Sequence, residues 1–249
     1  MFYDELLLNI DFYKMHPEYL PFIGDKYDEY KILHIGESHY IGQSKDALAE
    51  DKYPITYFEN WWSNSCLDLY HEYESWYNTR QVIANYLRGD RHKSHSIFSE
   101  TRKVFDKVYL GKDDVRINFE ESQNYHYFAF MNFFQMPSLY DGVKFWDSLK
   151  ISANKLGDAQ LASAMWHKAA QISSEVVDSV IDILKPSVVI FTSKSAKGAY
   201  DEYGKHHAEP YVISSIHPGC SWWNRRRYNG LTGKEELERK LSELKNKQY

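Results

Sequence analysis

Four chemically active side chains follow one another directly after a short apolar run, residues 32–35, which Gly36 ends. They are Glu37, Ser38, His39 and Tyr40. A carboxylate, a hydroxyl, an imidazole and a phenol can together transfer protons, attack a bond or hold a polar ligand. The run of β-formers predicts a buried strand, and the glycine predicts a turn after it. The same pattern also occurs in ordinary turns, where a Glu or Ser side chain only caps the next helix.

Two further polar residues lie in or directly after predicted strands. Asn132 interrupts the apolar run of residues 127–134, and His217 follows the run of residues 212–216. Each alone has an ordinary interpretation, because a buried Asn often satisfies backbone groups and a His-Pro pair often ends a strand. Parallel strands, however, place their carboxyl ends at one edge of the sheet, where ligands bind. We therefore expect Glu37, Asn132 and His217 to share one cleft.

The elements that position these residues alternate between helices and short strands. Apolar runs predict strands over residues 31–35, 127–134, 188–191 and 212–216. Apolar residues at helical spacing predict helices over residues 2–14, 59–87, 94–108, 161–183, 193–203 and 237–244. This alternation predicts the α/β class, as a three-layer α/β/α sandwich with a central four-stranded, mainly parallel sheet. We expect a single domain over residues 1–249, with an aromatic-rich helical insertion around residues 41–126.

Composition limits the classes of protein to consider. The formal net charge is −5 over 249 residues, so a nucleic-acid contact would need a local basic patch. Only Cys66 and Cys220 are present, which argues against a disulfide framework, a Cys₄ zinc site and an iron–sulfur cluster. The histidines lack the spacing of a metal motif, so neither a metal nor another cofactor is expected. The chain begins without the basic region of a secretion signal and has no apolar run of about 18 residues, so we expect a cytoplasmic protein with no membrane partner.

The order of short motifs along the chain resembles that of the uracil-DNA glycosylase superfamily. In that superfamily a first strand ends in a turn of the type G-Q-D-P-Y or G-E-A-P-G, and this chain has G-E-S-H-Y at residues 36–40. A second strand ends in Asn followed by a short run to Pro, and N-F-F-Q-M-P at residues 132–137 is similar to it. An L-x-P segment, a strand and a small-residue helix follow, as at residues 184–200. The last motif, H-P-S, corresponds to H-P-G at residues 217–219.

This resemblance implies a role for each matching residue. Glu37 would orient or deprotonate water and stabilise the cationic sugar, and His217 would donate a hydrogen bond to the departing base. Asn132 would read the Watson–Crick edge of a flipped base. The other residues of the base pocket would be Ser38, His39 and Tyr40. The turn departs from the family pattern, because Ser stands where one branch has Asp and His replaces the usual Pro.

The segment after His217 provides candidate DNA contacts. In the family this segment carries an intercalating loop, and basic residues beside it would hold phosphates. The candidates are Trp222, Trp223, Arg225, Arg226 and Arg227. A run of Arg is also common in solvated surface turns, and Gly219 replaces the Ser of the last motif. The net charge is acidic, and the cluster cysteines of the G-E-A-P-G branch are missing. With the departures above, these features indicate an outlying member of the family.

The predicted function is that of a divergent DNA glycosylase, which recognises a flipped, damaged or modified base and hydrolyses its N-glycosidic bond. Its partner would be single- or double-stranded DNA. The sequence leaves two alternatives open: a non-catalytic module that binds nucleobases or nucleic acid on the same fold, and a serine esterase with Ser38 as nucleophile and His217 as base. A DNA enzyme should show a positive groove near residues 225–227, and an esterase should show a narrow, neutral site near Ser38.

Overall fold

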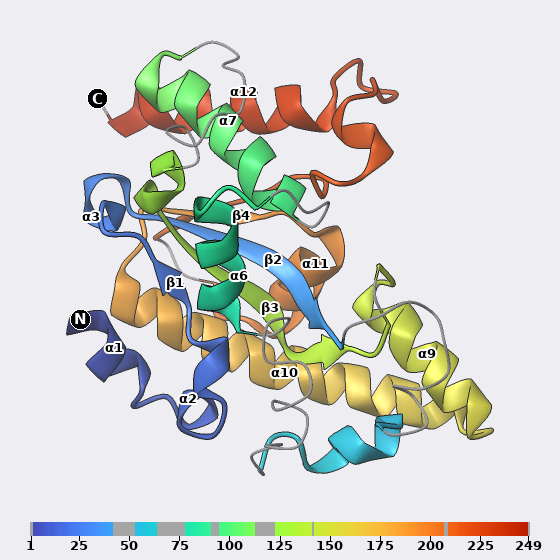
Figure 1. The fold of residues 1–249 in the computed structure, drawn as a ribbon. Helices are drawn as coiled ribbons and strands as arrows, with labels where there is room; N and C mark the ends of the chain where they lie inside the picture. Colours follow the sequence, from blue (N-terminus) through green and yellow to red (C-terminus); the bar gives the residue numbers. More distant parts are fainter. Residues whose placement is uncertain are drawn as a thin grey trace.

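The computed structural model describes residues 2–41, 53–63, 78–90, 95–112, 123–140, 142–206 and 209–248. It has a mixed α/β fold around one five-stranded sheet with the strand order β1-β3-β2-β4-β5 (Figure 1). The strands are β1 (Phe22–Ile23), β2 (Ile32–Tyr40), β3 (Phe128–Ser138), β4 (Val188–Phe191) and β5 (Tyr211–Ser214). β2 pairs in parallel with β3 and β4, and β4 pairs in parallel with β5, whereas β1 is antiparallel to β3. The predicted four strands are thus corrected to five, because the two residues of β1 are too few to give an apolar pattern.

The order of the strands creates a switch point at β2. The chain passes from β2 to β3 on one side, and then crosses over to β4 and β5 on the other. In open α/β sheets ligands bind outside the carboxyl ends of the strands at such a point. β4 pairs with β2 only from Ile32 to Ile35, whereas β3 continues along β2 as far as Tyr40. Residues 36–40 therefore have one neighbouring strand, and their other side faces the segments that follow β4 and β5.

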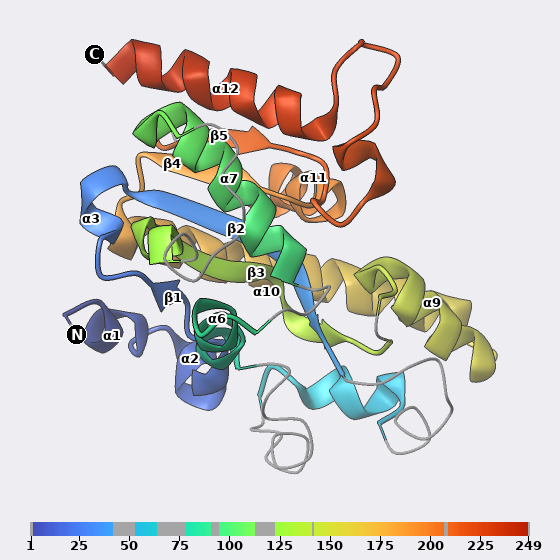
Figure 2. The same cartoon turned by 45° about the horizontal axis from the view of Figure 1, so that its top comes forward.

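Helices cover both faces of the sheet (Figures 1 and 2). One face buries the side chains of Leu33 and Ile35, and the other buries those of Ile32 and Ile190. The helices over the first face are α1 (Phe2–Leu7), α2 (Asp11–Met15), α9 (Phe145–Lys155), α10 (Ala159–Leu184) and α11 (Lys194–Tyr203). Those over the second face are α6 (Thr79–Leu87), α7 (Ser96–Leu110) and α12 (Gly233–Gln248). Alternate residues of each strand enter two different cores, which explains why the strands are apolar almost throughout.

The remaining helical turns are short. They are η1 (Pro17–Tyr19), α3 (Tyr27–Tyr30), η2 (Ile55–Asn60), η4 (Gln123–Tyr127) and η5 (Ser221–Trp223). A membrane span would need a longer apolar helix than any found in the described part of the chain.

Two predicted elements near the N-terminus differ from the structure. β2 continues through residues 36–40, where a turn is predicted, because β3 keeps pairing with it and places Asn132 opposite Gly36. The predicted helix over residues 2–14 is two helices, α1 and α2. Between them the Asn9 side chain donates a hydrogen bond to the Glu5 carbonyl oxygen (3.1 Å). A side chain that takes a backbone carbonyl in this way competes with helix continuation.

The aromatic-rich insertion is described only in part. Of its predicted helix over residues 59–87, the last part is the helix α6. The 3₁₀ turn η2 covers the start of the predicted helix and the residues just before it. Residues 42–52, 64–77, 91–94 and 113–122 of the insertion, with Cys66 among them, lie outside the described residues. In the second half of the chain the long helix α10 and the strand β4 lie where they are predicted. Ser193 caps α11 as predicted, because its Oγ accepts a hydrogen bond from the Ala196 amide (3.2 Å).

Candidate functional site

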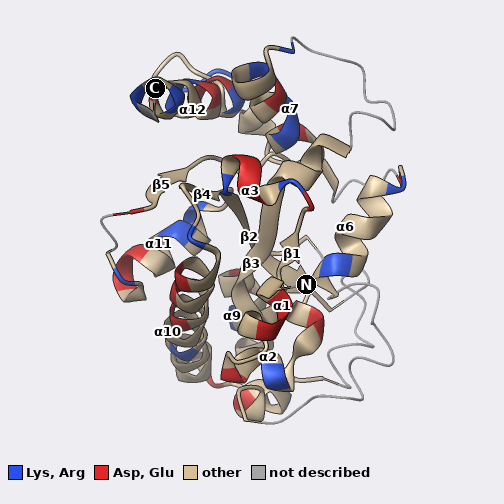
Figure 3. Cartoon of the chain, turned by 90° about the vertical axis from the view of Figure 1, so that its left-hand side faces the viewer, with Lys and Arg blue, Asp and Glu red and all other residues tan. Residues whose placement is uncertain are grey.

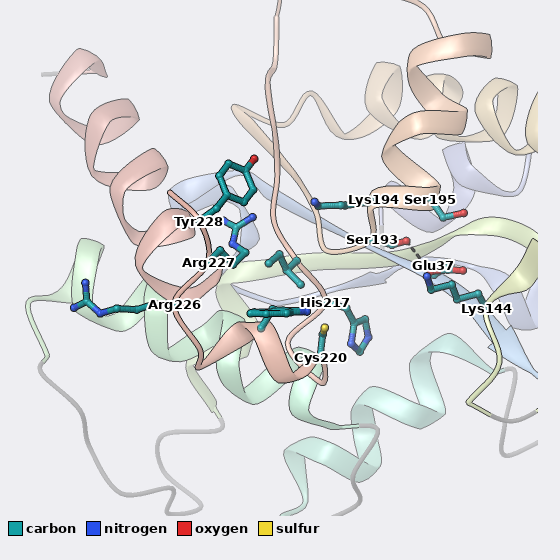
Figure 4. A pocket seen from close by; sticks show the side chains of 12 residues that line it. Glu37, Lys144, Ser193, Lys194, Ser195, His217, Cys220, Arg226, Arg227 and Tyr228 are labelled. Carbon is teal, nitrogen blue, oxygen red and sulfur yellow. Dashed lines mark hydrogen bonds between the residues drawn. The ribbon is translucent and has the colours of Figure 1, made fainter. Parts of the chain in front are cut away.

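The Glu37 carboxylate is held between the N-terminal ends of two helices. Its Oε1 accepts a hydrogen bond from the backbone N–H of Phe145, the first residue of α9 (3.1 Å). Its Oε2 accepts a hydrogen bond from the Oγ of Ser193, the N-cap of α11 (2.7 Å; dashed in Figure 4). Donors at helix N-termini complement a negative charge. Glu37 therefore has a fixed orientation at the open side of β2, next to the point where β4 ends.

His217 lies three residues beyond β5 and is partly buried. Its Nδ1 accepts a hydrogen bond from the backbone N–H of Gly219 (3.0 Å). Burial lowers the pKa of His217, and the negative charge of Glu37 acts in the opposite direction. A neutral imidazole that accepts at Nδ1 carries its proton at Nε2. His217 is thus arranged as a neutral hydrogen-bond donor.

A small pocket of about 140 Å³ lies between the end of β2 and the helices α6 and α7. The sequence-predicted residues that line it are Glu37, Ser38, His39, Tyr40, Asn132 and His217. The structure therefore brings together the residues predicted to be catalytic and base-binding, from β2, β3 and the segment after β5. The remaining wall is largely apolar and consists of Thr79, Val82, Ile97, Phe98 and Phe130.

Two polar groups in the small pocket have no hydrogen-bond partner within the described part of the chain. Asn132 is only 9% exposed, and its side-chain amide makes no hydrogen bond to the described residues. The Oγ of Ser38 is buried and likewise has no partner among them. His39, in contrast, is hydrogen-bonded through Nε2 to Thr79 Oγ1 (3.0 Å) and packs edge-on against Tyr19. Because buried polar groups are normally paired, the free amide and hydroxyl are suited to a polar ligand in this pocket.

A larger cavity of about 650 Å³ shares Glu37 and His217 with the small pocket (Figure 4). Its other lining residues are Lys144, Ser193, Lys194, Ser195, Ile216, Cys220, Trp222, Arg226, Arg227 and Tyr228. The lining thus carries four basic side chains and one carboxylate. Elsewhere basic and acidic residues are interspersed, as on α10, α11 and α12 in Figure 3, and the whole chain is acidic. Basic side chains therefore outnumber carboxylates among the residues that line this cavity.

The predicted DNA-contacting residues divide into exposed and engaged side chains. Trp222 is 50% exposed, and Arg225 is exposed. Trp223 is fully buried, and its Nε1 donates to Glu100 Oε2 (3.0 Å), so its predicted place on an exposed wedge is corrected to the core. Arg227 forms an ion pair with Glu236. Arg226 donates to the Gly230 carbonyl oxygen (2.9 Å) and lies 3.7 Å from the Glu235 carboxylate, pointing away from the other labelled residues in Figure 4.

A second histidine supports the site from within the sheet. His34 is fully buried, and its Nδ1 accepts from the Tyr125 hydroxyl (2.7 Å). Its Nε2 donates to Thr192 Oγ1 (3.0 Å), whose hydroxyl donates in turn to the Ile35 carbonyl oxygen (3.1 Å). Burial lowers the pKa of His34 to about 3, and nearby His217 acts in the same direction. His34 is therefore neutral and ties β2 to β4 at the level where the site begins.

Several site residues carry no motif in the sequence. Lys144, Lys194 and Tyr228 belong to polar segments without a pattern, and Ser193 is predicted only as a helix cap. Ser193 nevertheless follows β4 almost directly, so the rule that ligands bind at strand carboxyl ends could have identified it. Ile97 and Phe98 come from the insertion, and only the folded chain shows which of its many aromatic residues reach the pocket.

The geometry favours acid–base chemistry over nucleophilic attack by Ser38. Ser38 and His217 line the same pocket, but the Ser38 hydroxyl is not hydrogen-bonded to His217, and its Oγ has no partner among the described residues. Cys220 is a free thiol. Within the described ranges no group of three His, Cys, Asp or Glu side chains is placed to hold a metal ion. What remains is a fixed carboxylate and a neutral N–H donor, facing a shared space from two segments.

Comparison of the chain with models of protein families, with curated proteins and with solved structures finds no match. The function is therefore interpreted from the geometry of the two cavities and from the motifs that line them.

Proposed function

We propose that this chain is a divergent glycosylase of the uracil-DNA glycosylase type, which hydrolyses the N-glycosidic bond of a damaged or modified base in DNA. The proposal includes the three-layer α/β/α arrangement of that superfamily. One observation carries it: the motif residues of β2, β3 and the segment after β5 line a single pocket, with Glu37 and His217 at its junction with the larger cavity.

The size and lining of the small pocket support a single-ring base. An apolar cavity of about 150 Å³ holds one benzene-sized ring, and this pocket measures about 140 Å³. Phe98 and Phe130 provide apolar surface for the ring. The amide of Asn132 can donate and accept hydrogen bonds, as the edge of a pyrimidine-like base requires.

The reaction would break the bond between C1′ of the sugar and the base nitrogen. Positive charge develops on the sugar and negative charge on the base as the bond lengthens. The Glu37 carboxylate would offset the positive charge and accept a proton from the water that adds to C1′. The Nε2–H of His217 would donate to the base oxygen that gains negative charge. The products are the free base, which takes up a proton from solvent, and an abasic sugar.

The test is single-turnover base release from oligonucleotides that carry different modified bases, followed by alkaline cleavage of the abasic sites. Glu37→Gln should lower the rate of base release by about 10²–10⁴-fold, because glutamine cannot accept the proton. Binding of the same oligonucleotide should change little, because glutamine retains the size of the side chain. Glu175→Gln, on the exposed side of α10, is the matched control and should release base at the wild-type rate.

Two results would replace the proposal. If the wild type binds modified oligonucleotides but releases no base from any of them, the chain is a binding module. If the wild type releases no base from any of them and Ser38→Ala abolishes its hydrolysis of an ester, the chain is a serine esterase. If Glu37→Gln releases base at the wild-type rate, Glu37 is not the catalytic carboxylate.

A further inference from the structure

The larger cavity has more room and a different lining than a base pocket requires. Its volume is about 650 Å³, against about 140 Å³ for the small pocket. Two aromatic side chains at its edge are unusually exposed, Trp222 at 50% and Tyr228 at 100%. A fully exposed Tyr gains nothing from the folding of this chain, because it buries no surface. Aromatic faces in this position are suited to stacking against a flat ligand.

The larger cavity is also lined by two basic side chains that have no partner among the described residues. They are Lys144, drawn beside Glu37 in Figure 4, and Lys194, whose amino group is drawn on the side of Tyr228. Neither forms an ion pair or a hydrogen bond with the described residues, whereas Arg226 and Arg227 are engaged by Glu235 and Glu236. Two free ammonium groups in one cavity with an aromatic side chain are suited to a group that has both a planar ring and a phosphate.

We propose that the larger cavity is a second nucleotide subsite, and that the protein binds a single nucleic-acid strand. The strand would pass from the small pocket into the larger cavity at Glu37 and His217, which line both. The neighbouring base stacks on Trp222 or Tyr228, and Lys144 and Lys194 contact the phosphates. In a duplex the neighbouring base stays paired and stacked, so it cannot enter this cavity. The inference rests on the proposed function only for the assignment of the small pocket to the target base.

The test uses fluorescence anisotropy with a labelled oligothymidine of about 12 nucleotides, alone and annealed to its complement. The single strand should bind about tenfold or more tightly than the duplex. At least one of the variants Trp222→Ala and Tyr228→Ala should weaken binding of the single strand by about 5- to 150-fold, the range expected for loss of one base–aromatic stack. Tyr211→Ala is the matched control, because Tyr211 is an exposed tyrosine of β5 that lines neither cavity.

The two lysines are tested by salt dependence. Loss of two phosphate contacts on a single strand should reduce the slope of log K against log salt concentration by about 1.4 in the double variant Lys144→Ala/Lys194→Ala. Lys185→Ala, a control at an exposed lysine after α10, should leave the slope unchanged. Thermal unfolding of each variant is the control for folding, and each Tm should match that of the wild type because the substituted side chains are at the surface or line a cavity.

Tighter binding of the duplex would overturn the inference, and so would wild-type affinity in both aromatic variants. These outcomes are distinct from failure of the proposed function, because oligothymidine binding requires no base release. If Tyr228→Ala weakens binding of the single strand but the wild type releases no base, the subsite is supported and the glycosylase assignment is refuted. If the wild type and Tyr228→Ala both release base from duplex DNA as well as from single strands, the glycosylase assignment is supported and the subsite is refuted.

Discussion

Gly36→Ala is expected to displace the Asn132 amide from the small pocket. The two residues are opposite each other in the parallel pair of β2 and β3. A Cβ on Gly36 would lie 2.3 Å from Asn132 Oδ1, 3.1 Å from Phe130 Cζ and 3.3 Å from Ile97 Cδ1. Ordinary van der Waals contact begins at 3.4 Å, so Oδ1 must retreat by about 1 Å. Gly36 is therefore needed for space, since its backbone is not in the left-handed region.

The stability lost in Gly36→Ala depends on how far the neighbouring side chains can move away from the new Cβ. Asn132 Oδ1 is at the end of a side chain, so the amide can rotate, at a cost of about 0.5–1.5 kcal/mol for leaving its rotamer. With crowding against Phe130 and Ile97, we expect the free energy of unfolding to fall by about 1–3 kcal/mol. In a protein of this size each kcal/mol lowers Tm by about 2–4 °C. The displaced amide would also lose the hydrogen bonds to the base that the proposed function assigns to it, so affinity for the target oligonucleotide should fall by about tenfold.

The assay combines urea unfolding with oligonucleotide binding. The double variant Gly36→Ala/Asn132→Ala lacks the clashing oxygen. Its loss of unfolding free energy should therefore be smaller than the sum of the two single losses by about 0.5 kcal/mol or more, and its affinity should not recover. Gly198→Ala is the control, because a Cβ there meets no atom within 4 Å in helix α11 and should stabilise the chain slightly. Wild-type stability and affinity in Gly36→Ala, or strict additivity in the double variant, would refute the reasoning.

Three further predictions test the residues around the site. Ser193→Ala removes the cap of α11 and one hydrogen bond to Glu37, so urea unfolding should show a loss of about 1 kcal/mol and base release should slow less than in Glu37→Gln. The pKa of His34 is about 3 in the folded chain and 6.5 in the unfolded chain, so the unfolded state binds more protons between these pH values. The free energy of unfolding, measured with urea at several pH values, should therefore fall as the pH drops below 6.5, and it should fall less steeply in His34→Gln. Asn132→Asp should change which modified base is released most rapidly, because a carboxylate cannot donate to the base edge.

The second half of the fold was predictable because its elements are long or uniformly apolar. The apolar stripe of α10 persists over seven turns, and β4 is a run of four apolar residues closed by a clear helix cap at Ser193. Such patterns identify an element without knowledge of its neighbours. The predicted end of β5 is less accurate, because β4 ends at Phe191 and its register with β5 ends at Ser214, although residues 215 and 216 are still small or apolar.

The end of β2 was not predictable in the same way. Polar residues after a glycine indicate a turn, yet residues 36–40 remain in the strand. The pairing with β3 supplies their backbone hydrogen bonds, and this pairing depends on a segment about a hundred residues later in the chain. The strand can tolerate polar side chains there because it has left β4 and borders two cavities. The deviation from the sequence pattern thus coincides with the candidate site, as expected where function overrides local preference.

The partners of Glu37 explain how its charge remains available in the proposed reaction. A salt bridge to Lys or Arg would fix the carboxylate but would also neutralise it. Glu37 instead accepts hydrogen bonds from the backbone N–H of Phe145 and the hydroxyl of Ser193, and it forms no ion pair with the described residues. These dipoles hold its orientation without adding a full positive charge beside it. The histidines act in the same direction, because His34 and His217 are kept neutral by burial. Neither the hydrogen-bond donors of Glu37 nor these two histidines would therefore oppose the positive charge that develops at C1′ with a full positive charge of their own.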